Sequence, residues 1–193
     1  MNKLNDIKKE CIEEGFPIVS DDAAELLSLC LRLKQPKAVL EIGTALGYSA
    51  GIILSSCSCF LTTVEIKESS YLRAKENLTK LGLIERAKLI CIDAKDYLVN
   101  LTAKFDFIFL DGPKGQYNNY LPYLLDALNE GGILFCDNTK YHGIVDGTLI
   151  PERRDRTIMN NMREFTENLK KNKDLYVYEY DISDGIIIVI KIR

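Results

Sequence analysis

Short apolar segments alternate with longer amphipathic segments along most of the chain. Five apolar segments have the length and composition of buried strands: 38–43, 60–65, 88–92, 105–110 and 133–136. Four segments between or after them have the spacing of helices: about 47–56, 68–81, 94–101 and 117–129. Because short apolar strands that alternate with helices form parallel sheets, this pattern predicts an α/β fold with helices on both faces of a doubly wound sheet.

The region before the first strand predicts a further helix. It starts near Asp22, which can cap the helix while Glu25 reaches back to the same turn. Leucines recur along it and predict a wide buried face: Leu26, Leu27, Leu29, Leu31 and Leu33. The polar run Lys34–Lys37, which contains a proline, ends this helix.

The C-terminal part of the chain departs from the alternation. A long amphipathic helix is expected over about 152–171, with four apolar residues on one face: Ile158, Met162, Phe165 and Leu169. The segments 175–180 and 186–192 then flank a Ser183-Asp184-Gly185 turn, which predicts an antiparallel strand pair at the sheet edge. We therefore expect about seven strands, mostly parallel, in one domain over residues 1–193.

The first strand runs into a glycine-containing turn. Gly43 and Gly47 are separated by three residues, and Glu65 ends the next strand 22 positions after Gly43. Glycines let backbone N–H groups approach a ligand, and a carboxylate at this distance can hold ribose hydroxyls. The G-x-G-x-x-G spacing that wraps a pyrophosphate is missing, which favours S-adenosylmethionine over NAD. A plain strand–turn–helix without a ligand and an NAD-dependent oxidoreductase remain alternatives.

Acidic residues also follow two later strands. Asp111 comes after 105–110, and Asp137 with Asn138 comes after 133–136. Ligands of doubly wound sheets bind beyond the carboxyl ends of the strands, and oxygen donors there suit Mg²⁺ or Mn²⁺. Lys114, three residues after Asp111, can reach the same substrate. The alternative is that both aspartates only cap the following turns and that Lys114 is a solvated surface residue.

Composition narrows the possible environment and partners. The chain has 193 residues, a net charge of −3, six cysteines and one histidine, His142. The cysteines lack metal-ligand spacing and indicate reduced, buried thiols. With neither a long apolar run nor an N-terminal signal pattern, we expect a cytoplasmic protein without a membrane segment. The net charge provides no global attraction for nucleic acid.

With these motifs, nearly the whole chain resembles the cation-dependent class I O-methyltransferases, a Rossmann-like family that includes catechol and caffeoyl-CoA O-methyltransferases. The resemblance implies S-adenosylmethionine as cofactor, a homodimer, and a set of cofactor-binding residues: Val19, Glu41, Gly43, Thr44, Gly47, Tyr48, Ser49, Glu65, Asp93, Ala94 and Asp111. It also implies metal ligation by Asp111, Asp137 and Asn138, and a catalytic pair of Lys114 and Asp111. Lys114 would remove the acceptor's proton, for which it must be neutral part of the time.

Within that family, two segments are most similar to bacterial enzymes that methylate 5-hydroxyuridine in tRNA: Lys34–Lys37 and Lys114–Tyr117. Like a catechol, 5-hydroxyuracil carries neighbouring oxygens, so a small phenol is the alternative acceptor. Three arginines lie near the start of the long helix: Arg153, Arg154 and Arg156. Their positive charges could bind phosphate, or Glu152 and Asp155 could balance them. His142 is expected at the pocket rim or in a capping role.

The chain also departs from the family pattern. Asp111 is followed by Gly112-Pro113, and most of the N-terminal helical region of longer relatives is missing before Phe16. A match for the late glutamate of the animal catechol site is not evident. A binding protein that keeps the pocket without catalysis is therefore a further alternative, although four intact residues argue against it: Asp111, Lys114, Asp137 and Asn138.

Overall fold

The computed structural model describes residues 3–140, 145, 147, 152 and 155–193. The chain divides into two compact units, Met1–Asn100 and Leu101–Arg193, and each is described here by itself. The expectation of one domain over residues 1–193 stays a prediction. Along the described residues, no helix is long and apolar enough to span a membrane.

The first unit contains three parallel strands in the order β3-β2-β1. Their bounds are Ala38–Ile42 for β1, Phe60–Glu65 for β2 and Ala87–Cys91 for β3. The helices are α1 (Lys3–Glu13), α2 (Asp21–Lys34), α3 (Tyr48–Ser56), α4 (Glu68–Leu81), α5 (Ala94–Val99) and the short 3-10 helix η1 (Ile84–Arg86). Ile42 of β1 pairs with Val64 of β2, so the two strands end side by side.

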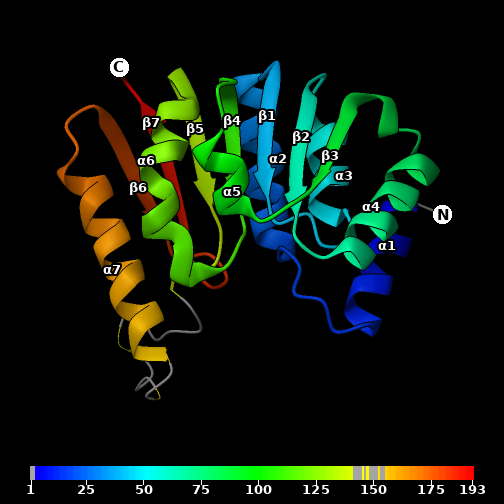
Figure 1. Ribbon diagram of the computed structural model, residues 1–193, viewed down its shortest axis with the longest axis horizontal. Helices are drawn as coiled ribbons and strands as arrows, with labels where there is room; N and C mark the ends of the chain where they lie inside the picture. The colour runs from blue at the N-terminus through cyan, green and yellow to red at the C-terminus, as the bar shows by residue number, and fades with distance from the viewer. Residues whose placement is uncertain (1–2, 141–144, 146, 148–151, 153–154) are drawn as a thin grey trace. The chain divides into compact units, whose positions relative to one another are not determined.

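Helix α3 is the most deeply buried helix of the first unit, since eight of its nine residues are buried. Helices α1, α2 and α4 all pack against it (Figure 1). A Cβ at Gly51 would lie 2.6 Å from Leu4 Cδ1 and 3.0 Å from Leu81 Cδ1, so α1 and α4 approach α3 closely here. Helix α1 was not expected from the sequence pattern, because only Ile7 and Cys11 of its residues are buried.

Helix α2 shows two differences from its sequence prediction. Its cap is Ser20, whose hydroxyl accepts the Ala23 N–H at 3.3 Å, and not Asp22. Its buried face is also narrow: Leu27 and Leu31 are buried, whereas Leu33 is exposed. Four-residue spacing places Ala23, Leu27 and Leu31 on one line along the helix, and the leucines outside that line point away from it. The helix ends at Gln35, which has a left-handed φ of 49°.

The second unit contains four strands in the order β4-β5-β7-β6. Their bounds are Phe105–Leu110 for β4, Leu128–Cys136 for β5, Leu175–Tyr180 for β6 and Ile186–Lys191 for β7. β4 and β5 are parallel, and β7 is antiparallel to both β5 and β6. The helices are η2 (Lys114–Gln116), α6 (Tyr117–Ala127) and α7 (Asp155–Lys171), which Figure 1 shows in green to orange. The predicted parallel strands with an antiparallel C-terminal pair are confirmed.

Strand β5 begins earlier than predicted. It was expected after Gly131-Gly132 but runs through both glycines from Leu128. Its pairing with β4 shifts there, since Phe105 pairs with Leu128 and Phe107 with Ile133. Gly131 has a φ of 67° and absorbs the irregularity, which explains why the sequence pattern predicted a break.

The core of the second unit is aromatic. Phe107 of β4 stacks on Phe135 of β5 with ring centroids 6.4 Å apart. Phe109 of β4 packs against the same ring in a tilted arrangement, with centroids 5.7 Å apart. Helix α7 buries Met162, Phe165 and Leu169 on the face predicted from its spacing. Phe165 meets the ring of Tyr117 edge-on at 5.5 Å, which brings α7 onto the start of α6.

Candidate active site

The loop after β1 has the conformation that the glycine spacing suggested. Gly43, Ala45 and Gly47 have positive φ angles of 100°, 45° and 85°. The Gly47 N–H donates to the Thr44 carbonyl at 2.8 Å and closes the turn before α3. A Cβ at Gly47 would lie 3.3 Å from Ala74 on α4, so a larger residue would push the loop away from α4. The loop therefore presents backbone at the carboxyl end of β1, where a ligand can approach it.

The Glu65 carboxylate is held by the backbone on both of its oxygens. Oε2 accepts the Ala45 N–H at 2.9 Å, and Oε1 accepts the Lys67 N–H at 2.9 Å. Each oxygen retains a second lone pair for another donor. The side chain is therefore oriented before any ligand binds, and the two free lone pairs match the two hydroxyls of a ribose.

A buried network of polar side chains supports the loop from inside the first unit. Thr63 Oγ1 donates to Glu41 Oε2 at 2.6 Å and lies 2.5 Å from Thr44 Oγ1. All three side chains are essentially inaccessible, with Glu41 0% exposed. Asn77 Nδ2 adds a bond of 3.1 Å to the Leu46 carbonyl. Glu41 and Thr44 thus shape the loop through their side chains, and their predicted contact with a cofactor stays a prediction.

The remaining cofactor candidates lie around this loop or at neighbouring helix starts. Tyr48 and Ser49 are buried in the first turn of α3. Asp93 caps α5 by accepting the Lys95 N–H at 2.7 Å, and Ala94 is the first residue of that helix. Val19 is buried just before the Ser20 cap of α2. Their role in binding also remains a prediction.

In the second unit, the side chain of Lys114 contacts that of Asp111, as the three-residue spacing suggested. Lys114 Nζ donates to Asp111 Oδ1 at 2.7 Å and to Tyr117 Oη at 2.9 Å. The Lys114 side chain is only 12% exposed and that of Asp111 21%. The ammonium is thus in a partly dehydrated pocket, where a charged partner interacts more strongly than it would at the surface.

Tyr117 is a site residue for which the sequence analysis assigned no role. Its side chain is fully buried, and its O–H lies 2.8 Å from the Leu110 carbonyl and 3.1 Å from the Asp137 carbonyl. Burial, followed by the charge of Asp111, raises the pKa of Tyr117 well above its usual range. The phenol therefore stays neutral and links the ends of β4 and β5 to Lys114. The three-residue spacing from Lys114 was the signal that could have identified it.

Asp137 is an acid in an unfavourable environment. It is 1% exposed, and its Oδ1 accepts the Asn138 N–H at 2.9 Å. Burial, followed by the negative charge of Asp111, raises the pKa of Asp137 from 3.8 to about 6. The two carboxylates therefore repel each other across the site, and a cation bound between them would relieve that repulsion.

The donor set fits a hard divalent cation. Across the described part of the chain, no three or more His, Cys, Asp or Glu side chains form a group that could hold a metal ion. The predicted ligands are instead two carboxylates and the amide of Asn138. Mg²⁺ commonly takes one or two carboxylates and keeps other positions for water or substrate, so this set suits it better than an all-protein cage.

Several predicted features fall elsewhere. His142, Arg153 and Arg154 lie outside the described residues. Whether Glu152 and Asp155 balance the charges of the two arginines therefore stays a prediction. Arg156 is described and is exposed in the first turn of α7, next to Asp155. The described cysteines are free thiols, but Cys91 is exposed, contrary to the expectation of buried thiols.

Comparisons with known proteins agree with this architecture. The O-methyltransferase family model matches residues 2–192. A caffeoyl-CoA O-methyltransferase from Stellaria longipes is 29% identical over 186 residues, covering 89% of this chain and 75% of the relative. A catechol O-methyltransferase from Niastella koreensis is 29% identical over 168 residues, covering 83% of this chain and 74% of the relative. A Staphylococcus aureus structure, described as a putative caffeoyl-CoA O-methyltransferase, superposes with a TM-score of 0.91 at 27% identity over 99% of this chain and 93% of that one.

The fold and the matched family define a Rossmann-like methyltransferase. The chain belongs to the O-methyltransferase family, and the prediction of an S-adenosylmethionine-dependent O-methyltransferase is confirmed. The alternatives of an NAD-dependent oxidoreductase and of a non-catalytic binding protein are not favoured.

Proposed function

We propose that this chain catalyses divalent-cation-dependent methylation of a hydroxyl that has a neighbouring oxygen. The observation that carries the proposal is the buried Asp137 carboxylate, whose pKa is raised to about 6 by burial and by Asp111, while Lys114 Nζ donates to that same Asp111. Such an arrangement is unfavourable in a merely structural site and is typical of sites that bind a cation and move a proton.

Two bound groups would supply the chemistry that the chain lacks. S-adenosylmethionine provides the methyl group, and the divalent cation brings the two acceptor oxygens together and favours ionisation of the hydroxyl. Asp111, Asp137 and Asn138 would hold the cation. The Gly43–Ser49 loop and Glu65 would hold the adenosyl part, with Asp93-Ala94 on the adenine side.

Lys114 would act as the general base. In its neutral form Nζ takes the proton from the acceptor hydroxyl and becomes an ammonium. Asp111 and Tyr117 then stabilise that ammonium through the bonds of 2.7 and 2.9 Å. The two partners would also orient Nζ for the next cycle.

For the acceptor, we propose 5-hydroxyuridine in tRNA. The support is the similarity of Lys34–Lys37 and Lys114–Tyr117 to enzymes with that activity, together with the exposed Arg156. The second candidate is a catechol-like phenol, which is favoured by the names of the curated relatives. Both acceptors present two neighbouring oxygens, so the same cation site would serve either.

Metal removal tests the core of this proposal. Protein dialysed against EDTA should lose methyl transfer to either acceptor, and Mg²⁺ or Mn²⁺ should restore it. Calorimetry on the same samples should show that S-adenosylmethionine still binds, because all of its predicted contacts except Asp111 lie in the first unit. Full activity in metal-free protein would contradict the proposed cation dependence.

The acceptor is tested by comparing tRNA from a deletion strain with simple catechols. If tRNA is the acceptor, turnover should fall steeply with added salt, and Arg156→Gln should reduce both tRNA affinity and that salt slope. Arg193→Gln, at the exposed C-terminus, is the matched control. Normal methoxyuridine levels in the deletion strain, combined with turnover of a catechol, would return the assignment to a small phenol.

A further inference from the structure

We propose that the turn of the C-terminal hairpin, residues 182–185, is a positioning element for Asn138. This inference rests on the proposed function, in which Asn138 is a ligand of the divalent cation. The turn connects β6 and β7 and lies more than 40 residues further along the chain than Asn138. The hairpin would therefore contribute to the cation site as well as extending the sheet.

The backbone of Asn138 is held on both sides. Before it, the Asp137 N–H donates to the Leu110 carbonyl of β4 at 3.1 Å. After it, the Thr139 N–H donates to the Gly185 carbonyl at 2.9 Å and the Lys140 N–H to the Asp184 carbonyl at 2.8 Å. Between these anchors Asn138 has a left-handed φ of 54°, a conformation that asparagine adopts more readily than other residues with a Cβ. The hairpin turn thus supplies two of the bonds that fix the backbone next to Asn138 in this left-handed conformation.

Gly185 is the residue that permits this approach. Its φ is 83°, and a Cβ there would lie 2.5 Å from Lys140 Cγ, 2.8 Å from Thr139 Oγ1 and 3.0 Å from Lys140 N. The turn itself is closed by the Gly185 N–H, which donates to the Ile182 carbonyl at 2.9 Å. Any side chain at position 185 would therefore move the turn away from Thr139 and Lys140, and the two main-chain bonds would lengthen.

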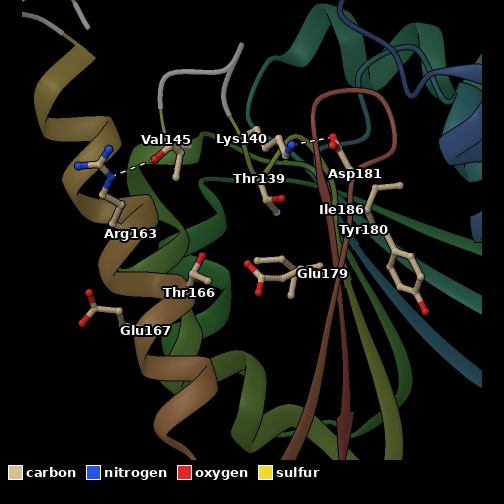
Figure 2. Close-up of a pocket in the computed structure, with 11 residues that line it drawn as sticks. Thr139, Lys140, Val145, Arg163, Thr166, Glu167, Glu179, Tyr180, Asp181 and Ile186 are labelled. Carbon is tan, nitrogen blue, oxygen red and sulfur yellow. Dashed lines mark hydrogen bonds and ion pairs between the residues drawn. The ribbon is translucent and has the colours of Figure 1, made fainter. Parts of the chain in front are cut away.

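Figure 2 shows the same junction from the side of a cavity of about 500 Å³ between α7 and the hairpin. Lys140 and Asp181 point toward each other across the junction, and Lys140 Nζ lies 2.6 Å from Asp181 Oδ1. Asp181 is 84% exposed, so this ion pair contributes little to the free energy of the junction. The main-chain bonds and the close approach of Gly185 carry the positioning.

Two glycine variants separate the effect of losing the positioning contacts from the effect of placing an alanine at a left-handed φ. Gly185→Ala adds both a left-handed alanine and the close contacts, whereas Gly82→Ala adds a left-handed alanine at φ 72° with nothing within 4 Å. Mn²⁺ affinity is measured from the electron paramagnetic resonance signal of the free ion, and S-adenosylmethionine affinity by calorimetry. We expect Gly185→Ala to raise the Mn²⁺ dissociation constant at least tenfold. Gly82→Ala should change it less than twofold, and both variants should bind S-adenosylmethionine normally.

A second measurement uses the unmodified protein, in case Gly185→Ala does not fold. If the turn positions Asn138 for the cation, bound cation must stabilise the turn in return, because coupling between two sites is reciprocal. Saturating Mg²⁺ should therefore slow hydrogen exchange of the Thr139 and Lys140 amides, while the amide of Val177, far along the hairpin, stays unchanged.

The outcomes distinguish this inference from the proposed function. If the unmodified protein fails to bind Mn²⁺, the cation dependence itself is wrong. If it binds Mn²⁺ and the folded Gly185→Ala variant binds it equally well, or if Mg²⁺ leaves the Thr139 and Lys140 amides unaffected, the turn has only a structural role.

Discussion

Glu65 in the first unit and Asp137 in the second are both acids at strand ends, but their surroundings differ. Each Glu65 oxygen accepts a backbone N–H, from Ala45 or Lys67. Asp137 is more deeply buried, accepts the N–H of its neighbour Asn138, and is subject to the negative charge of Asp111, so its pKa rises to about 6.

The difference shows two ways of preparing a carboxylate for a ligand. Backbone donors stabilise the charge of Glu65 and orient it, so this acid can receive neutral hydroxyl donors without further compensation. The charge of Asp137 is incompletely compensated, so this acid is prepared for a ligand that brings positive charge. The contrast agrees with an adenosyl site in the first unit and a cation site in the second.

The largest expected effect comes from Lys114, whose ammonium donates to Asp111 in the second unit. Lys114→Ala should lower kcat by about 10²–10⁴ while affinity for S-adenosylmethionine stays nearly intact, because the variant removes the proposed base and leaves the first unit unchanged. Single-turnover kinetics and calorimetry provide the two readouts.

Lys114→Arg is the matched variant for this prediction. It keeps the positive charge beside Asp111, but a guanidinium cannot give up its proton in a protein and so cannot act as a base. We expect kcat to fall nearly as far as in Lys114→Ala. An arginine variant with kcat close to the original value would show that Lys114 acts only through its charge.

The next effect concerns the electrostatic cost of Asp137 in metal-free protein. Because folding raises the pKa of this acid from 3.8 to about 6, the folded state binds its proton more tightly than the unfolded state does. The resulting contribution to stability is complete below about pH 4 and is lost as the pH rises through about 6.

Asp137→Asn removes that dependence while its side-chain oxygen can still accept the Asn138 N–H. In EDTA at pH 8 the variant should be more stable than the unmodified protein by up to roughly 3 kcal/mol, at 1.36 kcal/mol per pKa unit. Near pH 4 the two should be nearly equal. Denaturant unfolding at both pH values tests this, and a variant that is less stable at pH 8 would show that Asp137 is well compensated.

The smallest effect is expected at Glu65. Glu65→Ala should weaken S-adenosylmethionine binding by about 1.5–3 kcal/mol, since it removes charged hydrogen bonds to the ligand and frees the Ala45 and Lys67 amides. Glu68→Ala, which removes an exposed acid at the start of α4 and leaves the loop and its buried support intact, is the control. Unchanged calorimetric affinity in Glu65→Ala would remove this residue from the site.

The sequence pattern predicted most elements of the fold, and its errors have local physical causes. Helix α1 was missed because only one edge of it is apolar and buried, and the cap of α2 was misplaced because Ser20 and Asp22 can both cap a helix. Strand β5 was shortened because two adjacent glycines usually mark a turn, whereas here pairing with β4 carries the strand through them.

For the candidate site, the sequence alone determined which residue types follow each strand. Glycines in the loop after β1 and acids at positions 65, 111 and 137 are local features of the pattern, and each of them follows or ends a predicted strand. Three arrangements were decided only by the tertiary structure: the Tyr117 phenol between two strand ends, the Asp137 pKa and the Gly185 contact with Lys140. Each depends on distances between segments that are remote in sequence, and burial and close packing set those distances.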